Sequence, residues 1–287
     1  MGICFFAADL HGREDRYGKL FHAIKKEKPG AVFLGGDLFP SGFGALASAK
    51  ATYDDFLKSI LADGFARLKK DLGASYPSVF LIMGNDDGRF EEQRMEELHD
   101  QGLWFYMHGR CVLWENYAVY GYAYVPPTPF MLKDWERYDV SRYVDPLCIS
   151  PEEGWLSIEV PKGVLRHETI QNDLEKLVQE TDLSRTILLF HTPPYNTGLD
   201  RAALDGQKFD YVDLDVHVGS IAVRRFIESR QPLLTLHGHI HESARITGAW
   251  RERIGRTFSF SAAHDGRELA LVRFDPENLD AATRDLI

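Results

Sequence analysis

The chain has 287 residues, 44% of them hydrophobic, which is enough for one large domain with a sizeable core. Its 33 lysines and arginines against 43 aspartates and glutamates give a formal net charge of −10. This acidic balance, without a basic stripe, disfavours a surface that binds nucleic acid.

The remaining bulk features indicate a cytoplasmic protein. Three scattered cysteines without a CxxC spacing are typical of free thiols in a reducing compartment. We expect no signal peptide, because the N-terminal segment lacks a charged region and a cleavage site. No stretch has the length of a transmembrane helix. Without an internal repeat or a visible boundary, residues 1–287 are expected to form a single domain.

Apolar runs of strand length recur along the chain, and each ends at a polar residue that can bind a metal. Such runs are typical of strands buried on both faces. The predicted strands cover residues 3–8, 31–34, 78–82, 186–190 and 233–236. In the same order, they are followed by Asp9-Leu10-His11, Gly36-Asp37, Gly84-Asn85-Asp86-Asp87, His191 and Gly238-His239-Ile240-His241.

Helical patterns alternate with these strands, and shorter strands complete the prediction. Helices are expected over residues 17–28, 52–71, 91–98, 164–180 and 220–229. Shorter strands are expected over residues 104–106, 111–114, 117–122, 244–246, 256–261 and 268–274. Residues 41–48 and 197–217 are predicted to be loops, and residues 279–287 a tail.

Residues 123–160 form an irregular excursion that is rich in proline and aromatic residues. It is too aromatic for a disordered linker and too rich in proline for regular structure. We expect it to be ordered. Two roles stay open, because it can roof a pocket or pack on a neighbouring subunit of a homo-oligomer.

The polar residues at the strand ends are suited to a metal site. In extended backbone, residues i and i+2 point the same way, so His239 and His241 aim at one spot. If the strands share a sheet edge, all these side chains meet in one crevice. Carboxylate, imidazole and amide ligands suit Mn, Fe or Zn. A shared carboxylate such as Asp37 would hold two ions about 3.5–4 Å apart.

The ordered set of motifs resembles the calcineurin-like metallophosphoesterase family over residues 9–241. The resemblance implies an α/β fold, a four-layer sandwich of two mixed β-sheets with helices outside. It implies that a metal-bridging hydroxide attacks the phosphorus of a phosphoester. It also implies two groups of metal ligands that share one carboxylate: Asp9, His11, Asp37 and His241 for one ion, and Asp37, Asn85, His191 and His239 for the other.

The chain departs from the family pattern at Asp86, where a histidine usually follows the Gly-Asn motif. That histidine is often assigned to protonation of the leaving group. We interpret Asn85 and Asp86 as catalytic candidates, with the Asn85 amide donating to a phosphate oxygen. Asp86 would repel a dianionic phosphate, so phosphodiesters, or monoesters with good leaving groups, are the expected substrates. Asp87 is expected to form a salt bridge or to cap the following helix.

Other histidines and arginines are weaker candidates. His108 and His217 lie in loops, and either is a possible substitute for the missing acid. Arg89 and Arg110 are the basic residues nearest the motifs and are possible phosphate ligands. His237 should point away from the site. The four remaining histidines are expected to be structural or at the surface, namely His22, His99, His167 and His264.

The expected function is hydrolysis of small phosphoesters, with phosphodiesters preferred. A nuclease is an alternative that the acidic charge disfavours. A non-catalytic protein that binds nucleotides or regulates is a second alternative, although such a protein should have lost metal ligands. A protein phosphatase remains open, but no feature of the sequence indicates a peptide groove.

Overall fold

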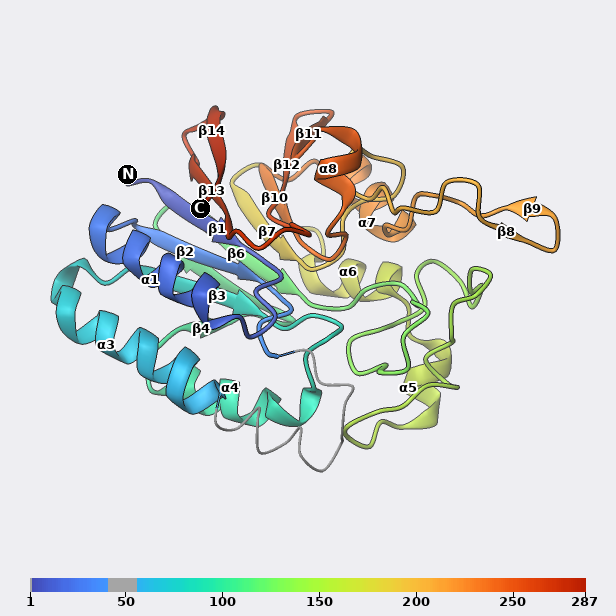
Figure 1. Ribbon diagram of the computed structural model, residues 1–287, viewed down its shortest axis with the longest axis horizontal. Coiled ribbons are helices and arrows are strands. Elements are labelled where there is room, and N and C mark those ends of the chain that lie inside the picture. The colour runs from blue at the N-terminus through green and yellow to red at the C-terminus, as the bar shows by residue number, and fades with distance from the viewer. Residues whose placement is uncertain (1, 41–55) are drawn as a thin grey trace.

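The computed structural model describes residues 2–40 and 56–287. Two six-stranded sheets form its centre, with helices outside them (Figure 1). The first sheet has the order β14-β13-β1-β2-β3-β4, and the second has the order β11-β12-β10-β7-β6-β5. Most neighbours are parallel, while β13, β14, β5 and β11 pair antiparallel. The predicted sandwich of two mixed sheets is therefore confirmed.

The strands of the first sheet are β1 (Cys4–Ala7), β2 (Ala31–Gly35), β3 (Ser78–Ile82), β4 (Phe105–Tyr106), β13 (Ala270–Asp275) and β14 (Asn278–Leu286). Those of the second are β5 (Arg110–Trp114), β6 (Tyr117–Tyr122), β7 (Thr186–Phe190), β10 (Leu234–His237), β11 (Arg251–Ile254) and β12 (Thr257–Ser261). A separate hairpin consists of β8 (Lys208–Phe209) and β9 (Val212–Asp213).

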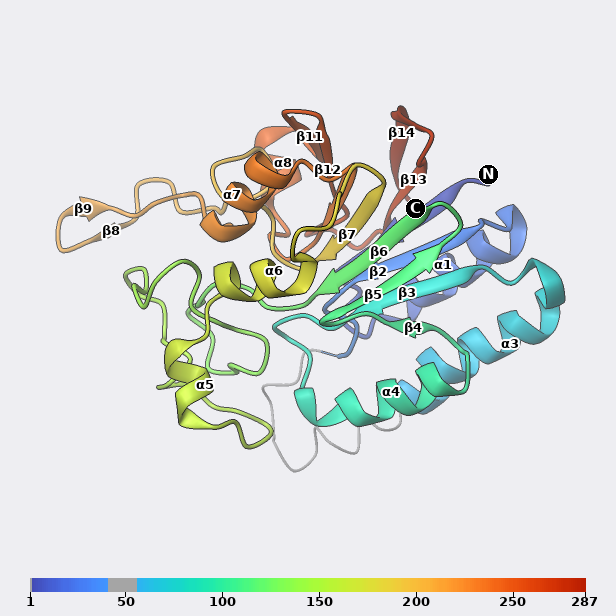
Figure 2. The ribbon, with the colours of Figure 1, turned by 180° about the vertical axis from the view of Figure 1, so that it is seen from behind.

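The helices are α1 (Glu14–Glu27), the π-helix η1 (Leu57–Ala62), α3 (Asp63–Leu72), α4 (Glu92–Asp100), α5 (Lys162–His167), α6 (Ile170–Val178), α7 (Ile221–Arg230) and α8 (Ser243–Thr247). Short 3-10 helices are η2 (Gly73–Ser75) and η3 (Arg89–Glu91). Helices α1, α3 and α4 lie along one outer side of the strands, and α6 and α7 along the other, as Figure 2 shows from behind. No described helix is both long and apolar enough to span a membrane.

The core lies between the two sheets. Phe33 and Phe80 of the first sheet contact Trp114 of the second, with ring centroids 6.3 and 6.1 Å apart. Phe260 of β12 meets Phe274 of β13 across the same layer at 6.1 Å. These aromatic contacts fix how the sheets face each other, and hence where their strand ends meet.

Several predicted elements are corrected. The first helix begins at residue 14, three residues before its predicted start. Residues 164–180 form two helices, because the chain becomes extended at Glu168 and the Thr169 side chain then caps α6 by accepting from the Asn172 N–H. The predicted strand at 244–246 is the helix α8, which ends at Gly248 in the left-handed conformation.

The C-terminal region differs as well. Residues 279–287 are not a tail, because β14 pairs with β13 and buries Leu279 and Ala282. Strand β11 was not predicted, and the loop predicted at 197–217 contains the hairpin β8–β9. The loop predicted at 41–48 and the start of the helix predicted at 52–71 lie outside the described residues.

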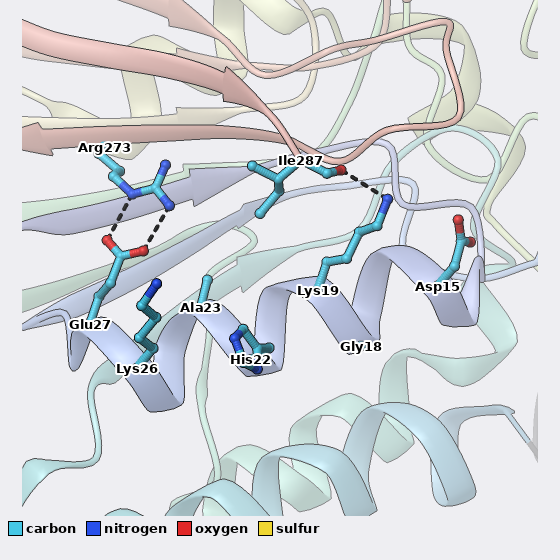
Figure 3. A pocket seen from close by; sticks show the side chains of 9 residues that line it. All are labelled: Asp15, Gly18, Lys19, His22, Ala23, Lys26, Glu27, Arg273 and Ile287. Carbon is cyan, nitrogen blue, oxygen red and sulfur yellow. Dashed lines mark hydrogen bonds and ion pairs between the residues drawn. The ribbon is translucent and has the colours of Figure 1, made fainter.

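Helix α1 is joined to the edge of the first sheet by ionic contacts around a hollow of about 510 Å³ (Figure 3). Both carboxylate oxygens of Glu27 accept hydrogen bonds from Arg273 at 2.8 Å. The Lys19 ammonium donates to the Ile287 carbonyl at 3.0 Å. These charged groups hold the helix against β13 and β14, so we assign this hollow a structural role.

The excursion over residues 123–160 contains no regular helix or strand, as predicted. Its interior holds a fully buried ion pair between Lys133 and Glu136, at 2.5 Å. The Lys133 ammonium also donates to the Thr128 carbonyl at 2.9 Å, and Glu136 accepts from the Thr128 N–H at 2.7 Å. This network adds to the few backbone bridges within the excursion, such as the pairing of Val125 with Glu136.

A second anchor of the excursion is an aromatic cluster around His108. The imidazole lies 4.8 Å from the Trp135 ring and 5.2 Å from the Tyr124 ring. Its Nδ1 accepts from the Ala123 N–H at 3.1 Å. Burial, reinforced by nearby arginines, lowers the pKa of His108 to about 3. His108 is therefore neutral in the folded protein at ordinary pH.

The buried ion pair yields a prediction for stability. Glu136→Leu should lower the free energy of unfolding by about 3–5 kcal/mol, because it leaves the Lys133 ammonium buried without a counter-charge. Lys133→Met/Glu136→Leu should recover at least half of that loss, since it removes both charges. Urea denaturation of the three proteins measures this. A double variant as unstable as the single variant would contradict the ion-pair explanation.

His108 yields a prediction for pH dependence. The unfolded chain binds a proton at this residue below a pKa of about 6.5, whereas the folded chain does not until about pH 3, so stability falls as the pH falls between these values. From about pH 7.5 to about pH 5, the wild type should lose about 2 kcal/mol more unfolding free energy than His108→Gln. His22→Gln, at an exposed site, is the control and should behave as the wild type. Equal losses in all three proteins would refute the assignment.

Candidate metal centre

The loops after β1 and β2 run side by side and present the first acidic residues. The Asp9 N–H donates to the Gly36 carbonyl at 3.0 Å, and the His11 N–H donates to the Asp37 carbonyl at 2.8 Å. Asp9, His11 and Asp37 all have positive φ values, of 56, 47 and 51°. Such backbone is costly for residues with side chains, and it occurs where a functional geometry requires it.

Glycines let the neighbouring loops approach these carboxylates. A Cβ at Gly84 would lie 2.3 Å from Asp37 Oδ1, and one at Gly238 would lie 2.8 Å from Asp9 Oδ2. Both distances are too short for a side chain. The glycines of the Gly-Asn and Gly-His motifs are therefore required by the close approach of the backbone to an acid.

One group of four predicted ligands is compact. The ligand atoms of Asp9, His11, Asp37 and His241 all lie within 4.8 Å of one another. The Nε2 atoms of His11 and His241 are 3.0 Å apart. His241 Nε2 lies 3.4 Å from Asp9 Oδ1, and His11 Nε2 lies 3.8 Å from Asp37 Oδ2. This is the set that the family resemblance implied for one ion.

The other predicted ligands lie around His191. His191 is fully buried, and its Nε2 lies 3.3 Å from Asp37 Oδ2 and 3.1 Å from Asn85 Oδ1. The His239 ring lies 5.1 Å from the His191 ring. His191 and Asn85 therefore adjoin the first group through Asp37, whose Oδ2 lies within 3.8 Å of the Nε2 atoms of both His11 and His191, and His239 adjoins His191.

The donor atoms fit metal ions. Asp9 Oδ2 is buried and has no hydrogen-bond partner among the described residues. The Nε2 atoms of His11 and His241 face each other at 3.0 Å. They lie next to the carboxylates of Asp9 and Asp37. Nitrogen and oxygen donors in this combination suit Mn, Fe or Zn. A cation there would satisfy the orphaned carboxylate oxygen.

The electrostatics of the metal-free chain also favour cations. Burial alone would lower the pKa values of His11 and His191, but neighbouring carboxylates outweigh burial and raise both to about 9. For Asp37, burial is likewise outweighed, here by His191 and His11, which lower the pKa of its carboxyl. Burial dominates at His239 and lowers its pKa to about 3. A divalent cation would replace the protons that the acids hold on His11 and His191.

Hydrogen bonds from outside the group orient two of the imidazoles. His191 Nδ1 bonds the Gly35 carbonyl at 2.7 Å, which turns Nε2 toward Asp37. His11 Nδ1 lies 3.1 Å from Asp86 Oδ2, and the Asp86 N–H donates to Asp37 Oδ1 at 2.8 Å. Asp86 thus supports the candidate ligand His11, in the way that carboxylates orient metal-bound histidines.

Asp87 has a role that the sequence did not indicate. Its buried carboxylate accepts from the N–H groups of Leu38, Phe39 and Gly84 at 2.8–3.1 Å. The expected cap or salt bridge to the following helix is therefore wrong. Asp87 instead fastens the loop after β2 to the loop after β3, which keeps Asp37 and Asn85 in register.

The structure separates the remaining candidates. His108 lies in its aromatic cluster and does not line the cavity. His217 does line the cavity, with Nδ1 at 2.7 Å from Asp200 Oδ1. Neither Arg89 nor Arg110 lines the cavity. Arg89 pairs with Glu92, and Arg110 pairs with Glu96. His237 points away, as predicted, and bonds the Thr192 carbonyl.

A cavity of about 940 Å³ opens onto the group of ligands. Its floor includes His11, Asp37, Asn85, Asp86 and His239. One wall comes from the excursion, at residues 126–130 and 139–148, so the excursion borders the pocket as one of its two expected roles requires. The opposite wall lies within residues 195–221, where the sequence predicts only a long loop and the start of a helix.

Comparisons with known proteins agree with this geometry. A stretch of 92 residues is 37% identical to an uncharacterized protein of Methanocaldococcus jannaschii, and it covers 31% of this chain and 35% of that protein. A crystal structure from Thermus thermophilus has a TM-score of 0.57 at 16% identity, covering 99% of this chain and 98% of the other. A dimetal phosphatase from Danio rerio has a TM-score of 0.50 at 12% identity, covering 95% and 91%.

At these identities, the structural likenesses concern the fold. The family model described as calcineurin-like phosphoesterase matches residues 5–243, a span that includes every candidate ligand from Asp9 to His241. With the two-sheet sandwich and the group of ligands at its strand ends, this match shows that the chain belongs to the calcineurin-like phosphoesterase family.

Proposed function

We propose that the protein is a dinuclear metal-dependent phosphoesterase that hydrolyses small phosphoesters and prefers phosphodiesters. The observation that carries this proposal is the position of Asp37, whose Oδ2 lies 3.8 Å from His11 Nε2 and 3.3 Å from His191 Nε2. A carboxylate between two sets of ligands is suited to bridging two ions. The similar fold of a protein described as a dimetal phosphatase supports the same proposal.

The ligand assignment follows from the two groups. Asp9, His11, Asp37 and His241 would hold one ion, and Asp37, Asn85, His191 and His239 the other. When bound, two divalent ions of Mn, Fe or Zn supply an acidic water as nucleophile at neutral pH and positive charge for the phosphate oxygens. The chain itself positions these donors through the Asp86 and Gly35 contacts of His11 and His191.

Asn85 and Asp86 have distinct proposed roles toward the substrate. The Asn85 Oδ1 faces His191, which leaves its NH₂ group to donate to a phosphate oxygen. Asp86 lines the cavity beside the ligands, so its carboxylate repels additional negative charge on the substrate. A phosphodiester carries one negative charge, and a monoester at neutral pH carries close to two. The diester preference rests on this difference.

The competing functions have less support. A nuclease would need cations along the cavity, and the described residues that line it include no lysine or arginine. A non-catalytic member of the family should have lost ligands, whereas this sequence keeps a candidate residue at all seven positions. The thiols form no disulfide, which supports the cytoplasm as the proposed location.

Metal removal tests the function. Chelation should abolish hydrolysis of bis(p-nitrophenyl) phosphate, and Mn²⁺ should restore it. Asp37→Asn should bind fewer than two ions per chain and lower kcat by at least about 100-fold, because the shared carboxylate is lost. Elemental analysis and steady-state kinetics measure both effects. Asp182→Asn, at an exposed site, should change neither. Full activity of chelated protein, or two ions in Asp37→Asn, would refute the proposal.

Asp86 tests the preference for diesters. Asp86→Asn keeps an oxygen for His11 but removes the charge. It should raise the ratio of kcat/KM for p-nitrophenyl phosphate over bis(p-nitrophenyl) phosphate by about fivefold, the effect of one unit charge a few ångströms away in a solvated site. Asp86→Glu, which keeps the charge, should leave the ratio nearer to that of the wild type. A wild type that already prefers the monoester, or an unchanged ratio in Asp86→Asn, would contradict the charge argument.

A further inference from the structure

The cavity extends well beyond the candidate metal ligands. Its inner end is lined by ligands such as His11, Asp37 and His239. Its outer part lies between the excursion and the segment that carries the hairpin β8–β9, at the end of the molecule away from α1 (Figure 1). The volume of about 940 Å³ is in the range of pockets that hold a whole small molecule. A phosphate at the ligands therefore leaves most of this space to the rest of the substrate.

Apolar side chains border the cavity from its inner end to its outer end. Ile240, between His239 and His241, begins this lining next to the candidate ligands. Farther out, both walls carry large apolar side chains that remain exposed: Phe130 by 57%, Tyr143 by 69%, Leu147 by 56%, Phe209 by 44% and Val212 by 70%.

These side chains belong to a wider concentration of exposed apolar surface. Among the described residues, eleven large apolar side chains are exposed, and seven of them lie within residues 130–147 and 209–212. The rest of the described surface therefore carries few such groups. Exposed apolar side chains that gather at the opening of one cavity are typical of a ligand-binding groove.

Polar groups of the same lining have partners within the chain or in solvent. The carboxylate of Asp139 accepts from the Ile221 N–H at 2.7 Å, at the N-terminus of α7. Glu242 accepts from the Ala203 N–H at 3.0 Å. Asp145 is exposed, so that water can solvate its carboxylate. These acids therefore do not require a charged ligand.

The charged groups on the hairpin side are also paired. The Lys208 ammonium lies 3.3 Å from Asp213 Oδ1, and His217 Nδ1 lies 2.7 Å from Asp200 Oδ1. Asp215 accepts from the backbone N–H of His217 at 2.9 Å. The surface of the outer cavity that still lacks a partner is therefore its apolar surface.

Continuity with the candidate ligands identifies what covers this surface. An alcohol part that is bonded to a phosphate at the ligands has the outer cavity next to it. If the alcohol part is apolar, entering the cavity removes apolar surface of both partners from water, which stabilises the complex. The lining continues from Ile240 to Phe209 and Val212, so it suits an extended chain better than a compact group.

We propose that the outer cavity binds an alkyl chain in the alcohol part of the substrate. The proposal rests on the proposed phosphodiesterase function and names its substrate class, phosphodiesters of alkyl alcohols. The phosphate lies at the candidate ligands, and the chain lies between the excursion and the segment of the hairpin. Diesters whose alcohol parts are small or strongly polar are poorer substrates.

A matched pair of substrates tests this in the Mn²⁺-loaded protein. p-Nitrophenyl octyl phosphate and p-nitrophenyl 2-(2-ethoxyethoxy)ethyl phosphate have the same leaving group, charge and chain length, and they differ only by oxygen in place of two methylene groups. At concentrations at which neither ester aggregates, the octyl ester should have a kcat/KM at least about tenfold higher, because its chain loses more apolar surface to the cavity. Equal or lower kcat/KM for the octyl ester would overturn the proposal.

The walls are tested by Phe130→Ser/Phe209→Ser, which removes one exposed ring from each wall. The ratio of kcat/KM for the octyl ester over the ether ester should fall to within about twofold of one, while turnover of p-nitrophenyl methyl phosphate stays within about twofold of the wild type. Leu113→Ser/Leu286→Ser removes two exposed apolar side chains outside the lining and should keep the wild-type ratio. A ratio that survives in Phe130→Ser/Phe209→Ser would refute the role of the walls.

A binding experiment separates this proposal from the proposed function. Saturation-transfer NMR should detect octan-1-ol on the wild type and much less on Phe130→Ser/Phe209→Ser, whether or not any ester is hydrolysed. Octanol binding of this kind without hydrolysis of any ester would reject the phosphodiesterase and keep the apolar site. Hydrolysis of bis(p-nitrophenyl) phosphate without octanol binding would keep the enzyme and reject the site.

A second copy of the chain is the competing occupant of the apolar surface. Sedimentation velocity should give the same molecular mass for the wild type and for Phe130→Ser/Phe209→Ser. A wild-type dimer that this variant dissociates would assign the exposed apolar side chains to a subunit interface and overturn the proposal.

Discussion

The rest of the site depends on the repulsion between two buried carboxylates. Asp9 and Asp37 follow neighbouring parallel strands and are almost completely buried. Two negative charges in such a position are stable only with positive charge nearby. In the metal-free chain, protons on His11 and His191 provide it, and the raised pKa values of both histidines express that need. Divalent ions would provide more positive charge than the two protons do. The geometry therefore agrees with the family match.

The supporting structure serves to hold these charges in place. Left-handed backbone at Asp9, His11 and Asp37 directs the acids and the first imidazole inward. Asp87 joins the loop after β2 to the loop after β3 by accepting hydrogen bonds from three backbone N–H groups. The hydrogen bonds from Gly35 and Asp86 then set the orientation of the imidazoles. A mixed-sheet sandwich makes this possible, because parallel strands of both sheets end at the same edge.

The sequence was sufficient to predict the parts of the fold that depend on local pattern. Apolar runs located the central strands. The polar residues just after them gave seven candidate ligands, four of which form the compact group around Asp9 and Asp37. Features that depend on distant contacts were not predictable. Strand β14 exists because β13 offers a partner, α8 is too short for a periodic signal, and the break before α6 depends on one capping threonine. The role of Asp87 required knowledge of which loops meet.

The same limit applies to the large cavity. Its walls come from an irregular excursion and from a polar segment, and neither carries a motif that points to a pocket. Only the fold shows that both segments border one space together with several of the candidate ligands.

The central claim is that one carboxylate joins two ions, and a crystal structure of Mn²⁺-loaded protein tests it most directly. Anomalous scattering should show two peaks about 3.5–4 Å apart. Both should lie within bonding distance of Asp37, with His11 and His241 on one and His191 and His239 on the other. A single peak, or peaks away from Asp37, would contradict the account.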